Sequence, residues 1–365
     1  MSELLKHRYS EAYVQRLAEG VTMVWPKFDR AGYRRAVLGD GWSTLELKQR
    51  MRRLSAMLHR FLPLKYPEQL AVLEKVAPSF GGLEGMLFPD FVEQFGLEHF
   101  GPSVRALELF TQHSSSEFAV RPYLVRYGER MLEAMRRWTG HPSEHVRRLA
   151  SEGSRPRLPW AMALPGFKRD PSPTIPILQA LKADSSEYVR RSVANHLNDI
   201  AKDHPEVVLK LARNWLGQNR ATDALLKHAC RTLLKRGEPR ALALFGYGRP
   251  ASVVVKALSR SAATLLVGED LHFSFVVQHR KRQPLALRLE YGVDFVKANG
   301  KTSRKIFQIT EGLFAPNQSR RFERKHRFRD FTTRRHYAGH HRLVILVNGQ
   351  TFAETSVRLL RRAGR

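Results

Sequence analysis

Apolar residues recur at helical spacing through the first two thirds of the chain and alternate with polar residues in the last third. In residues 45–62, leucine, methionine and phenylalanine return every three or four positions, and Pro63 follows the last of them. This spacing places the apolar side chains on one face of an amphipathic helix. The same criterion predicts helices over residues 1–35, 45–62, 66–77, 104–112, 117–127, 128–138, 143–153, 175–183, 188–203, 205–218, 221–236 and 239–245.

The pattern changes after Gly246, Gly248 and Pro250, which suit a linker. Short runs of alternating apolar and polar residues follow, separated by turn signals such as Asn348-Gly349. About seven short strands in about 115 residues are typical of an immunoglobulin-like β-sandwich. The predicted strands cover residues 252–257, 271–278, 285–291, 305–310, 320–328, 341–347 and 351–359. We therefore expect a helical domain at residues 1–250 and a sandwich at residues 251–365.

A six-residue pattern in the helical part recurs after 43 residues: Ser143–Arg148 is SEHVRR and Ser186–Arg191 is SEYVRR. Residues 116–121 and 227–234 carry weaker echoes. A helical period of about 40–47 residues is typical of HEAT and armadillo arrays, which stack helix pairs into a curved solenoid with a concave binding surface. The alternative is chance similarity in an arginine-rich helical chain. The predicted fold is therefore mainly α: a HEAT-like helical repeat solenoid followed by a C-terminal immunoglobulin-like β-sandwich.

Basic residues are in excess in both parts of the chain. The 62 Lys and Arg against 34 Asp and Glu give a formal net charge of +28 and a pI of about 10.8. Residues 251–365 alone hold 23 basic and 8 acidic residues, a net charge of +15. Folded basic domains of this kind usually bind polyanions, and nucleic acid is the leading candidate. A membrane surface is the second candidate, but no lysine-rich amphipathic terminal helix or lipidation motif supports it.

Several features of the sequence exclude particular kinds of site. Cys230 is the only cysteine, which excludes a disulfide within the chain and a cysteine cluster for a metal. No run of 18 apolar residues, phosphate-binding glycine loop or Gly-x-Ser-x-Gly elbow occurs, and no secretory signal is evident. The histidines His336, His340 and His341 are interpreted as part of a polyanion-binding surface and not as metal ligands. We expect a cytoplasmic monomer that needs no metal or other cofactor.

Residues 141–160, HPSEHVRRLASEGSRPRLPW, hold the most informative pattern. A helix is predicted to end by Gly153, which suits a helix C-cap and is followed by two prolines. The turn after it carries Arg155, Arg157 and Trp160. Guanidinium groups grip phosphates and an indole stacks on a base, so this turn indicates nucleic-acid binding. The alternatives are a solvated arginine face and a tryptophan that anchors the core between repeats.

Carboxylates near these arginines are the candidates for catalysis. Glu117 follows three serines, which predict a helix N-terminus where the helix dipole favours a carboxylate. Glu152 adjoins the arginine turn, while Asp199 and Asp203 lie four residues apart and can share a helix face. The alternative for Glu117 is an ordinary first-turn glutamate. For the two aspartates it is a set of hydrogen bonds to neighbouring loops of a helical repeat.

A family resemblance rests on three stretches: SEFAVRP at residues 116–122, EHVRRLASEGSRPRLPW at residues 144–160, and SVANHLNDIAKDHP at residues 192–205. They resemble the AlkC branch of the bacterial HEAT-like-repeat alkylpurine DNA glycosylases, the group that also includes AlkD. The resemblance covers most of the chain, including the β-sandwich that some members add. It implies hydrolysis of the N-glycosidic bond of small alkylated bases, chiefly N3-methyladenine, in double-stranded DNA.

The resemblance also implies which residue types surround the lesion. AlkD-type enzymes place an aspartate and tryptophans there, and in this chain the matching carboxylate would be a glutamate. A base methylated at a ring nitrogen is cationic and already a good leaving group, so the enzyme must stabilise an oxocarbenium-like sugar, position water and attract the cation. The residues leave open whether the base is flipped out or attacked in place, and AlkD-type enzymes favour the latter. The expected catalytic residues are Glu117, Glu152 and Trp160, and the expected DNA-binding residues are Arg121, Arg147, Arg148, Arg155, Arg157, Arg190, Arg191 and Lys202.

Two other functions remain open at this point. A non-enzymatic HEAT-repeat module that binds nucleic acid explains the charge and the repeats equally well, but it needs no carboxylate beside Trp160. A protein-binding solenoid is a third possibility, although the net charge disfavours neutral partners. If the chain binds DNA, the sandwich is expected to contact the same duplex as the helical domain. The candidate contact residues are Arg280, Lys281, Arg282 and residues 320–329.

Overall fold

The computed structural model describes residues 5–331 and 335–361. The contacts within the chain divide it into two compact units, the helical unit, Met1–Ala229, and the sandwich unit, Cys230–Arg365. Across the described residues, no helix combines the length and the apolar character that a membrane span requires.

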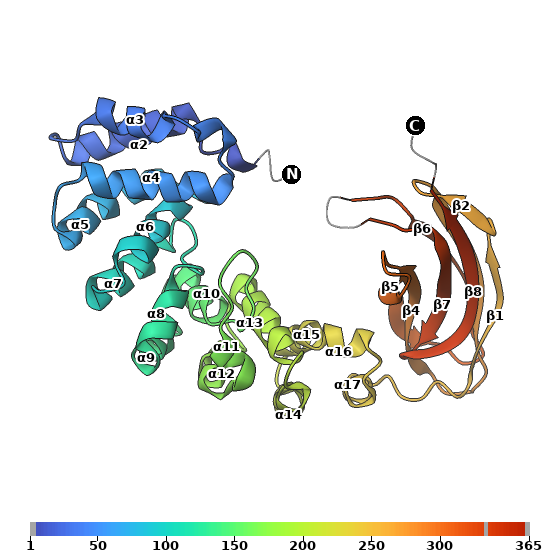
Figure 1. Ribbon diagram of the computed structural model, residues 1–365. Helices are drawn as coiled ribbons and strands as arrows, with labels where there is room; N and C mark the ends of the chain where they lie inside the picture. The colour runs from blue at the N-terminus through green and yellow to red at the C-terminus, as the bar shows by residue number, and fades with distance from the viewer. Residues whose placement is uncertain (1–4, 332–334, 362–365) are drawn as a thin grey trace. The chain divides into compact units, whose positions relative to one another are not determined.

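The helical unit is a stack of helices that follow a curve (Figure 1). The helices α4, α6, α10, α13 and α15 form the inner row of this curve, and α5, α7, α9, α12 and α14 form the outer row (Figure 1). In the inner row α4 packs on α6, α10 on α13, and α13 on α15. The α-helices of this unit are α2 (Glu11–Val24), α3 (Arg30–Leu38), α4 (Leu47–Phe61), α5 (Tyr66–Val76), α6 (Leu87–Phe95), α7 (Phe100–Phe110), α8 (Val120–Tyr127), α9 (Glu129–Trp138), α10 (Glu144–Gly153), α11 (Pro165–Arg169), α12 (Ile175–Leu181), α13 (Glu187–Ile200), α14 (Pro205–Trp215) and α15 (Arg220–Ala229). The predicted HEAT-like helical architecture is confirmed.

The 43-residue echo in the sequence has a structural reason. Arg147 on α10 donates from Nη1 to the carbonyl oxygens of residues 141–142, at 3.0 and 2.8 Å. Arg190 on α13 donates in the same way to the carbonyl oxygens of residues 184–185, at 2.6 and 2.8 Å. Each arginine therefore satisfies carbonyl groups in the turn before its own helix. The repeat in the sequence is a repeated way of closing that turn.

Helix α10 carries the centre of the predicted site, and its sequence explains its packing. Val146, Leu149 and Ala150 are fully buried at helical spacing. The helix ends at Gly153, as expected, but this glycine serves close packing and not a left-handed cap. A Cβ atom at position 153 would lie 2.5 Å from Cγ2 of Val120, so only glycine lets α8 approach α10 this closely.

Several boundaries differ from the predicted ones. Helix α8 begins at Val120 and not at Glu117, because the carbonyl oxygen of Ser116 accepts hydrogen bonds from the backbone N–H groups of Ala119 and Val120. Glu117 therefore lies in the turn before α8. The helix predicted over residues 221–236 is broken at Cys230 into α15 and α16. Helix α6 was not predicted, because its sequence LFPDFVEQF is almost uniformly apolar in its first half and contains a proline.

The described residues of the sandwich unit form two short helices and two β-sheets. One sheet has the strand order β1-β3-β6 and the other β2-β8-β7-β4-β5. Neighbouring strands are antiparallel except for the short β2, which runs parallel to β8. The elements are α16 (Arg231–Lys235), α17 (Pro239–Leu244), β1 (Val253–Arg260), β2 (Thr264–Leu266), β3 (Asp270–His279), β4 (Leu285–Val296), β5 (Thr302–Phe314), β6 (Ser319–Arg327), β7 (Gly339–Val347) and β8 (Gln350–Leu360). The predicted immunoglobulin-like sandwich is confirmed in class, and β2 is an addition to it.

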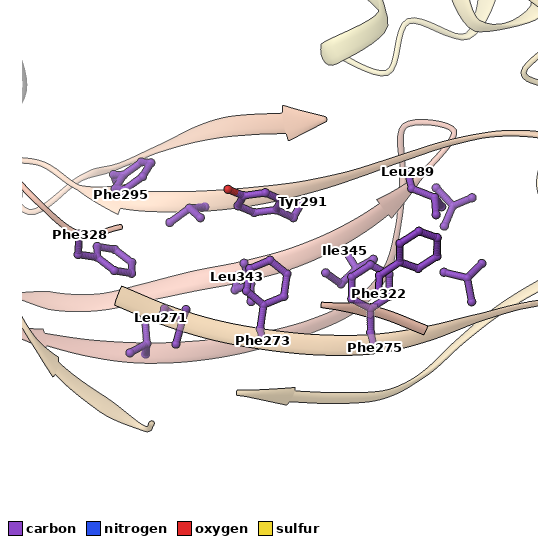
Figure 2. Close-up of a cluster of buried hydrophobic side chains, with 14 of the residues drawn as sticks. Leu271, Phe273, Phe275, Leu289, Tyr291, Phe295, Phe322, Phe328, Leu343 and Ile345 are labelled. Atoms are coloured by element: carbon purple, nitrogen blue, oxygen red, sulfur yellow. The ribbon is translucent and has the colours of Figure 1, made fainter. Parts of the chain in front are cut away.

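The two sheets enclose a core rich in phenylalanine (Figure 2). Strand β3 buries Leu271, Phe273, Phe275 and Val277 and leaves the residues between them more exposed, which is the alternation that the sequence predicted. Phe275 stacks on Phe322 of the neighbouring β6 with the ring centroids 5.5 Å apart. Aromatic pairs of this kind across neighbouring strands stabilise the sheet and fix its register.

Two predictions for the sandwich unit concern the hairpin turn between β7 and β8 and the residue at which the strands begin. Asn348 and Gly349 both have positive φ, 46° and 76°, as a type I′ hairpin turn requires. The strands begin at Val253, close to the boundary expected from the sequence. The contacts nevertheless group α16 and α17 with the strands, so the domain boundary at residue 250 stays a prediction.

Candidate active site

The turn after α10, residues 154–164, is held by a buried arginine. Arg121 on α8 is fully buried and donates from Nε to the carbonyl oxygen of Met162, at 2.5 Å. Its Nη1 donates to the carbonyl oxygens of Gly153 and Arg155, at 3.0 and 2.9 Å. Burial, followed by the nearby Arg155, lowers the pKa of Arg121 to about 10, which leaves it cationic at neutral pH. Arg121 was expected to contact DNA, but its burial assigns it the positioning of the turn.

Carboxylates and guanidinium groups alternate in a row that runs from the turn before α8 along α10 to α13. Arg148 Nη1 lies 2.6 Å from Glu117 Oε2, and Arg148 Nη2 lies 3.7 Å from Glu152 Oε1. Glu152 also forms an ion pair with Arg155, whose Nη2 lies 2.8 Å from Asp199 Oδ2. This charged row is therefore Glu117, Arg148, Glu152, Arg155 and Asp199. The structure thus brings together both predicted glutamates and the aspartate considered as their alternative.

Further polar groups fix the buried end of the charged row. Ser192 Oγ donates to Glu152 Oε2 at 2.7 Å, and Lys202 Nζ donates to Asp199 Oδ1 at 2.8 Å. The side chains of Glu152 and Asp199 are 7% and 3% exposed, whereas that of Glu117 is 22% exposed. Glu117 is therefore the carboxylate of this row that an entering molecule can reach most easily.

Trp160 is exposed and its backbone is strained. It is 62% exposed and has φ of 65°, a left-handed conformation that is uncommon for a bulky residue. The alternative of a core tryptophan is therefore wrong. Its carbonyl oxygen accepts a hydrogen bond from Lys48 Nζ, which belongs to α4, 112 residues earlier in the chain. This contact ties the turn after α10 to the first part of the helical stack.

Two cavities meet at Trp160. The first, called the Trp160 cavity, has a volume of about 60 Å³, and Glu117, Phe118 and Trp160 are among its lining residues. The second, called the α4 cavity, has a volume of about 400 Å³. It is lined by side chains of α4, α6 and the turn after α10, among them Lys48, Met51, Arg52, Asp90, Phe118 and Trp160. A carboxylate and an indole thus share one cavity, which is the arrangement expected for attracting a cationic base and stabilising a cationic sugar.

The other predicted DNA-binding residues fall into two groups. Arg147 and Arg190 close the turns before their helices, and Arg147 also binds the half-buried Asp184 at 2.7 and 3.0 Å. Arg157 pairs with Asp203 and holds the pKa of that carboxyl below its usual range. The remaining candidates, Arg191 and Lys202, are 66% and 36% exposed. Their contact with DNA stays a prediction.

The predicted basic residues of the sandwich unit also differ in exposure. Arg280, Lys281 and Arg282 form an exposed loop between β3 and β4. In β6 the residues alternate: Arg321, Lys325 and Arg327 are exposed, while Phe322 and His326 between them are buried. Part of the run 320–329 is therefore one outward strand face, and its contact with DNA remains a prediction.

Two of the histidines assigned to a polyanion-binding surface are not on the surface. His336 and His341 are 2% and 0% exposed and pack against the rings of Phe295 and Phe328. Burial lowers the pKa of His341, so it favours the neutral form. The interpretation was wrong for these two because both are buried, and of the three histidines only His340 is exposed. Within residues 5–331 and 335–361, no group of three or more His, Cys, Asp or Glu side chains suits a metal ion.

Several residues of the site were not singled out in the sequence. Lys48 and Met51 come from α4, and Tyr188 lies under Arg148, with the guanidinium carbon 5.0 Å from the ring centroid. Tyr188 stands in the second copy of the repeat, where the first copy has His145, so this difference within the pattern was an available signal. Lys48 carried no such signal, because its role depends on a contact over 112 residues.

His196 predicts a pH dependence of the stability of the helical unit. It is fully buried, its Nδ1 lies 2.9 Å from the carbonyl oxygen of Ser151, and burial lowers its pKa to about 4. The folded state therefore favours neutral His196, so stability present above the unfolded pKa of about 6.5 is lost as the pH falls toward 4. We expect a loss of about 3 kcal/mol between these limits, since one pKa unit corresponds to about 1.4 kcal/mol.

The measurement is urea unfolding between pH 4 and pH 7 of the wild type and the His196→Gln variant. All five tryptophans lie before residue 216, so tryptophan fluorescence reports the helical unit alone. His196→Gln should flatten the pH dependence, while His7→Gln, a change at an exposed histidine, should not. Parallel pH profiles of the wild type and His196→Gln would contradict the assignment.

Three comparisons place this arrangement among known proteins. Residues 254–361 match the family described as "Uncharacterised protein YhaZ, C-terminal Ig-like domain". The chain is 46% identical over 346 residues to the uncharacterized protein YhaZ of Bacillus subtilis (strain 168), covering 95% of this chain and 96% of that protein. It is similar to the solved structure of the Pseudomonas fluorescens alkylpurine DNA glycosylase AlkC bound to DNA containing an abasic site analog. That likeness has 40% identity and a TM-score of 0.94 and covers 98% of this chain and 99% of the other.

Proposed function

The chain belongs to the family of AlkC-type alkylpurine DNA glycosylases, and we propose that it removes small cationic alkylated bases, chiefly N3-methyladenine, from double-stranded DNA. The observation that carries this proposal is the shared cavity of Glu117 and Trp160 beside the charged row. A module that only binds nucleic acid has no need of a carboxylate next to an exposed indole. DNA is therefore proposed as substrate and partner, and base excision repair as the process.

The proposed reaction is hydrolysis at the sugar carbon C1′. The oxygen of a water molecule bonds to C1′ while the bond from C1′ to the base nitrogen breaks, and the electron pair of that bond leaves with the base. Because the methylated base starts as a cation, it leaves as a neutral molecule and needs no strong general acid. The proton of the water passes to solvent or to a carboxylate. A carboxylate close to C1′ stabilises the positive charge that develops on the sugar.

The carboxylates of the charged row are proposed to share this work unequally. Glu117 is the most exposed of them and lines the Trp160 cavity, so it is assigned to the sugar cation and the water. Glu152 and Asp199 each hold Arg155 and are almost fully buried, which suits the positioning of guanidinium groups. Trp160 is assigned to the cationic base, and cation–π contacts of this kind are worth about 0.5–2 kcal/mol.

The proposal is tested by incubating the protein with methylated duplex DNA and separating the released bases by chromatography. We expect free N3-methyladenine, with little release of unmodified bases, because a neutral base is a poor leaving group. Binding of the duplex without release of any methylated base would overturn the proposal and favour the non-enzymatic module.

The sandwich unit is proposed to bind phosphates of the same duplex. Replacing Arg280, Lys281 and Arg282 by alanine is expected to weaken binding. The slope of log Kd against log salt should fall by about 0.9 for each phosphate that the variant no longer neutralises. A matched triple variant at exposed cations of the outer helices, Lys75, Lys210 and Arg213, removes the same charge. Equal salt slopes for the two triple variants would contradict phosphate binding by this loop, because the loss of net charge alone would then explain the weaker binding.

A further inference from the structure

The α4 cavity holds charged groups that the reaction at Glu117 does not use. Lys48 and Arg52 lie one helical turn apart on α4, and both line this cavity next to Trp160. We propose that they bind a phosphodiester of the DNA strand beside the lesion and that Asp90 is the residue that orients Arg52. This inference rests on the proposed function, because it names a further contact between the protein and the same DNA.

The guanidinium group of Arg52 is held on two sides. Its Nε lies 3.1 Å from Asp90 Oδ1, and its Nη2 donates to Glu93 Oε1 at 2.6 Å. Among the hydrogen bonds of the described residues none involves Nη1, and the side chain is 44% exposed. A planar guanidinium fixed in this way presents its remaining N–H groups in one direction, which suits a phosphate oxygen.

Lys48 supplies the second cation and a link to the reaction. Its Nζ donates to the carbonyl oxygen of Trp160, so it lies against the residue assigned to the lesion. An ammonium group has three donors, and this contact uses one of them. A phosphate next to Trp160 would therefore meet Lys48 and Arg52 together.

Asp90 is an unusual residue for the interior of a helical stack. Its side chain is 0% exposed, and Oδ2 accepts hydrogen bonds from Ser55 at 2.8 Å and from Gln94 at 2.7 Å. Burial raises the pKa of Asp90 to about 6, although Arg52 opposes this effect. With a folded pKa above the unfolded value, the stability from this group is complete below the unfolded pKa and is lost as the pH rises from there to the folded pKa of about 6. At neutral pH the charged Asp90 therefore destabilises the fold, which points to a functional role for its charge.

A phosphate explains this arrangement better than a base does. The cavity has apolar walls from Met51, Phe118 and Met162, which a base could contact. A base, however, would gain little from two cations on one helix face, one of them oriented by a buried carboxylate. A phosphodiester oxygen matches both cations, and such contacts place the duplex without reading its sequence.

The test uses the full-length protein and a duplex oligonucleotide with a stable abasic-site analogue, titrated by fluorescence anisotropy over a range of salt concentrations. Arg52→Ala and Lys48→Ala are each expected to weaken binding and to lower the slope of log Kd against log salt by about 0.9. Arg60→Ala changes an exposed arginine near the end of the same helix and removes the same charge, so it serves as the control with a near wild-type slope. Arg52→Lys should restore part of the affinity that Arg52→Ala removes.

Asp90→Asn separates an orienting role from a structural one. We expect weaker DNA binding with an unfolding midpoint equal to or above that of the wild type, because the variant removes an unfavourable buried charge. A lower midpoint with wild-type affinity would overturn the orienting role. A wild-type slope for Arg52→Ala would overturn the phosphate site, and weaker binding without a change of slope would assign the cavity to a base. Base release by the wild type is measured separately, so failure of the proposed function is recognised on its own.

Discussion

Glu117→Gln is expected to slow the release of N3-methyladenine by about 10²- to 10³-fold under single-turnover conditions with saturating protein. The change keeps the shape of the side chain and removes the charge that faces the Trp160 cavity. Because Arg148 keeps Glu152 as an ion-pair partner when the charge of Glu117 is removed, the variant should unfold at nearly the wild-type midpoint. DNA affinity should also change little, since the carboxylate acts on a charge that appears only in the transition state.

Two further variants are compared with Glu117→Gln: Glu129→Gln is the control, and Glu152→Gln changes the second carboxylate of the charged row. Glu129 on the outer helix α9 is 65% exposed and pairs with Arg136 on the same helix, so its variant should excise at the wild-type rate. Glu152→Gln should reduce both affinity and rate, because Glu152 contacts Arg148 and Arg155. If Glu117→Gln and Glu152→Gln both release the base at the wild-type rate, the carboxylate assignment is wrong and Asp199 is the next residue to test.

Arg155→Leu is expected to destabilise the helical unit by about 3–5 kcal/mol and to abolish measurable excision. Removing this guanidinium leaves Glu152 and Asp199 buried with fewer compensating charges, and a lone buried carboxylate is strongly unfavourable. Urea unfolding followed by tryptophan fluorescence measures the stability loss in this unit.

The matched control for Arg155→Leu is Arg191→Leu. Arg191 pairs with Glu187 on the surface of α13, and the two side chains are 66% and 73% exposed. An exposed pair of this kind contributes about 0–1 kcal/mol, so the control should unfold close to the wild type. Equal destabilisation in the two variants would show that the charged row is no more than a surface network.

Local patterns were sufficient to predict most of the fold. The helical spacing, the 43-residue echo and the alternation after Pro250 each follow from periodicities that neighbouring residues impose. One helix boundary was predicted wrongly because backbone hydrogen bonds form a turn just before the helix. Ser116 satisfies the N–H groups of residues 119–120 and delays the start of α8, so that Glu117 lies in a turn and not in a helix.

The candidate site was only partly predictable, because its geometry depends on contacts between distant segments. The motif at residues 144–160 pointed to Arg155 and Trp160, but it could not show that Arg121 is buried beneath them. The charged row needs the turn before α8 to lie beside α10, and α10 to lie beside α13, and this packing is not visible in the sequence. Lys48 lay outside every motif, and its contact with the carbonyl of Trp160 exists only in the folded chain.

The turn that carries Trp160 has a consequence for how the protein searches DNA. Two of its carbonyl oxygens, those of Arg155 and Met162, accept hydrogen bonds from the side chain of Arg121, which is buried within the fold, so the conformational entropy of this turn is lost on folding. A scanning enzyme visits a vast excess of undamaged positions. Because the backbone of this turn is already ordered, we expect that a visit to an intact base pair requires no folding step.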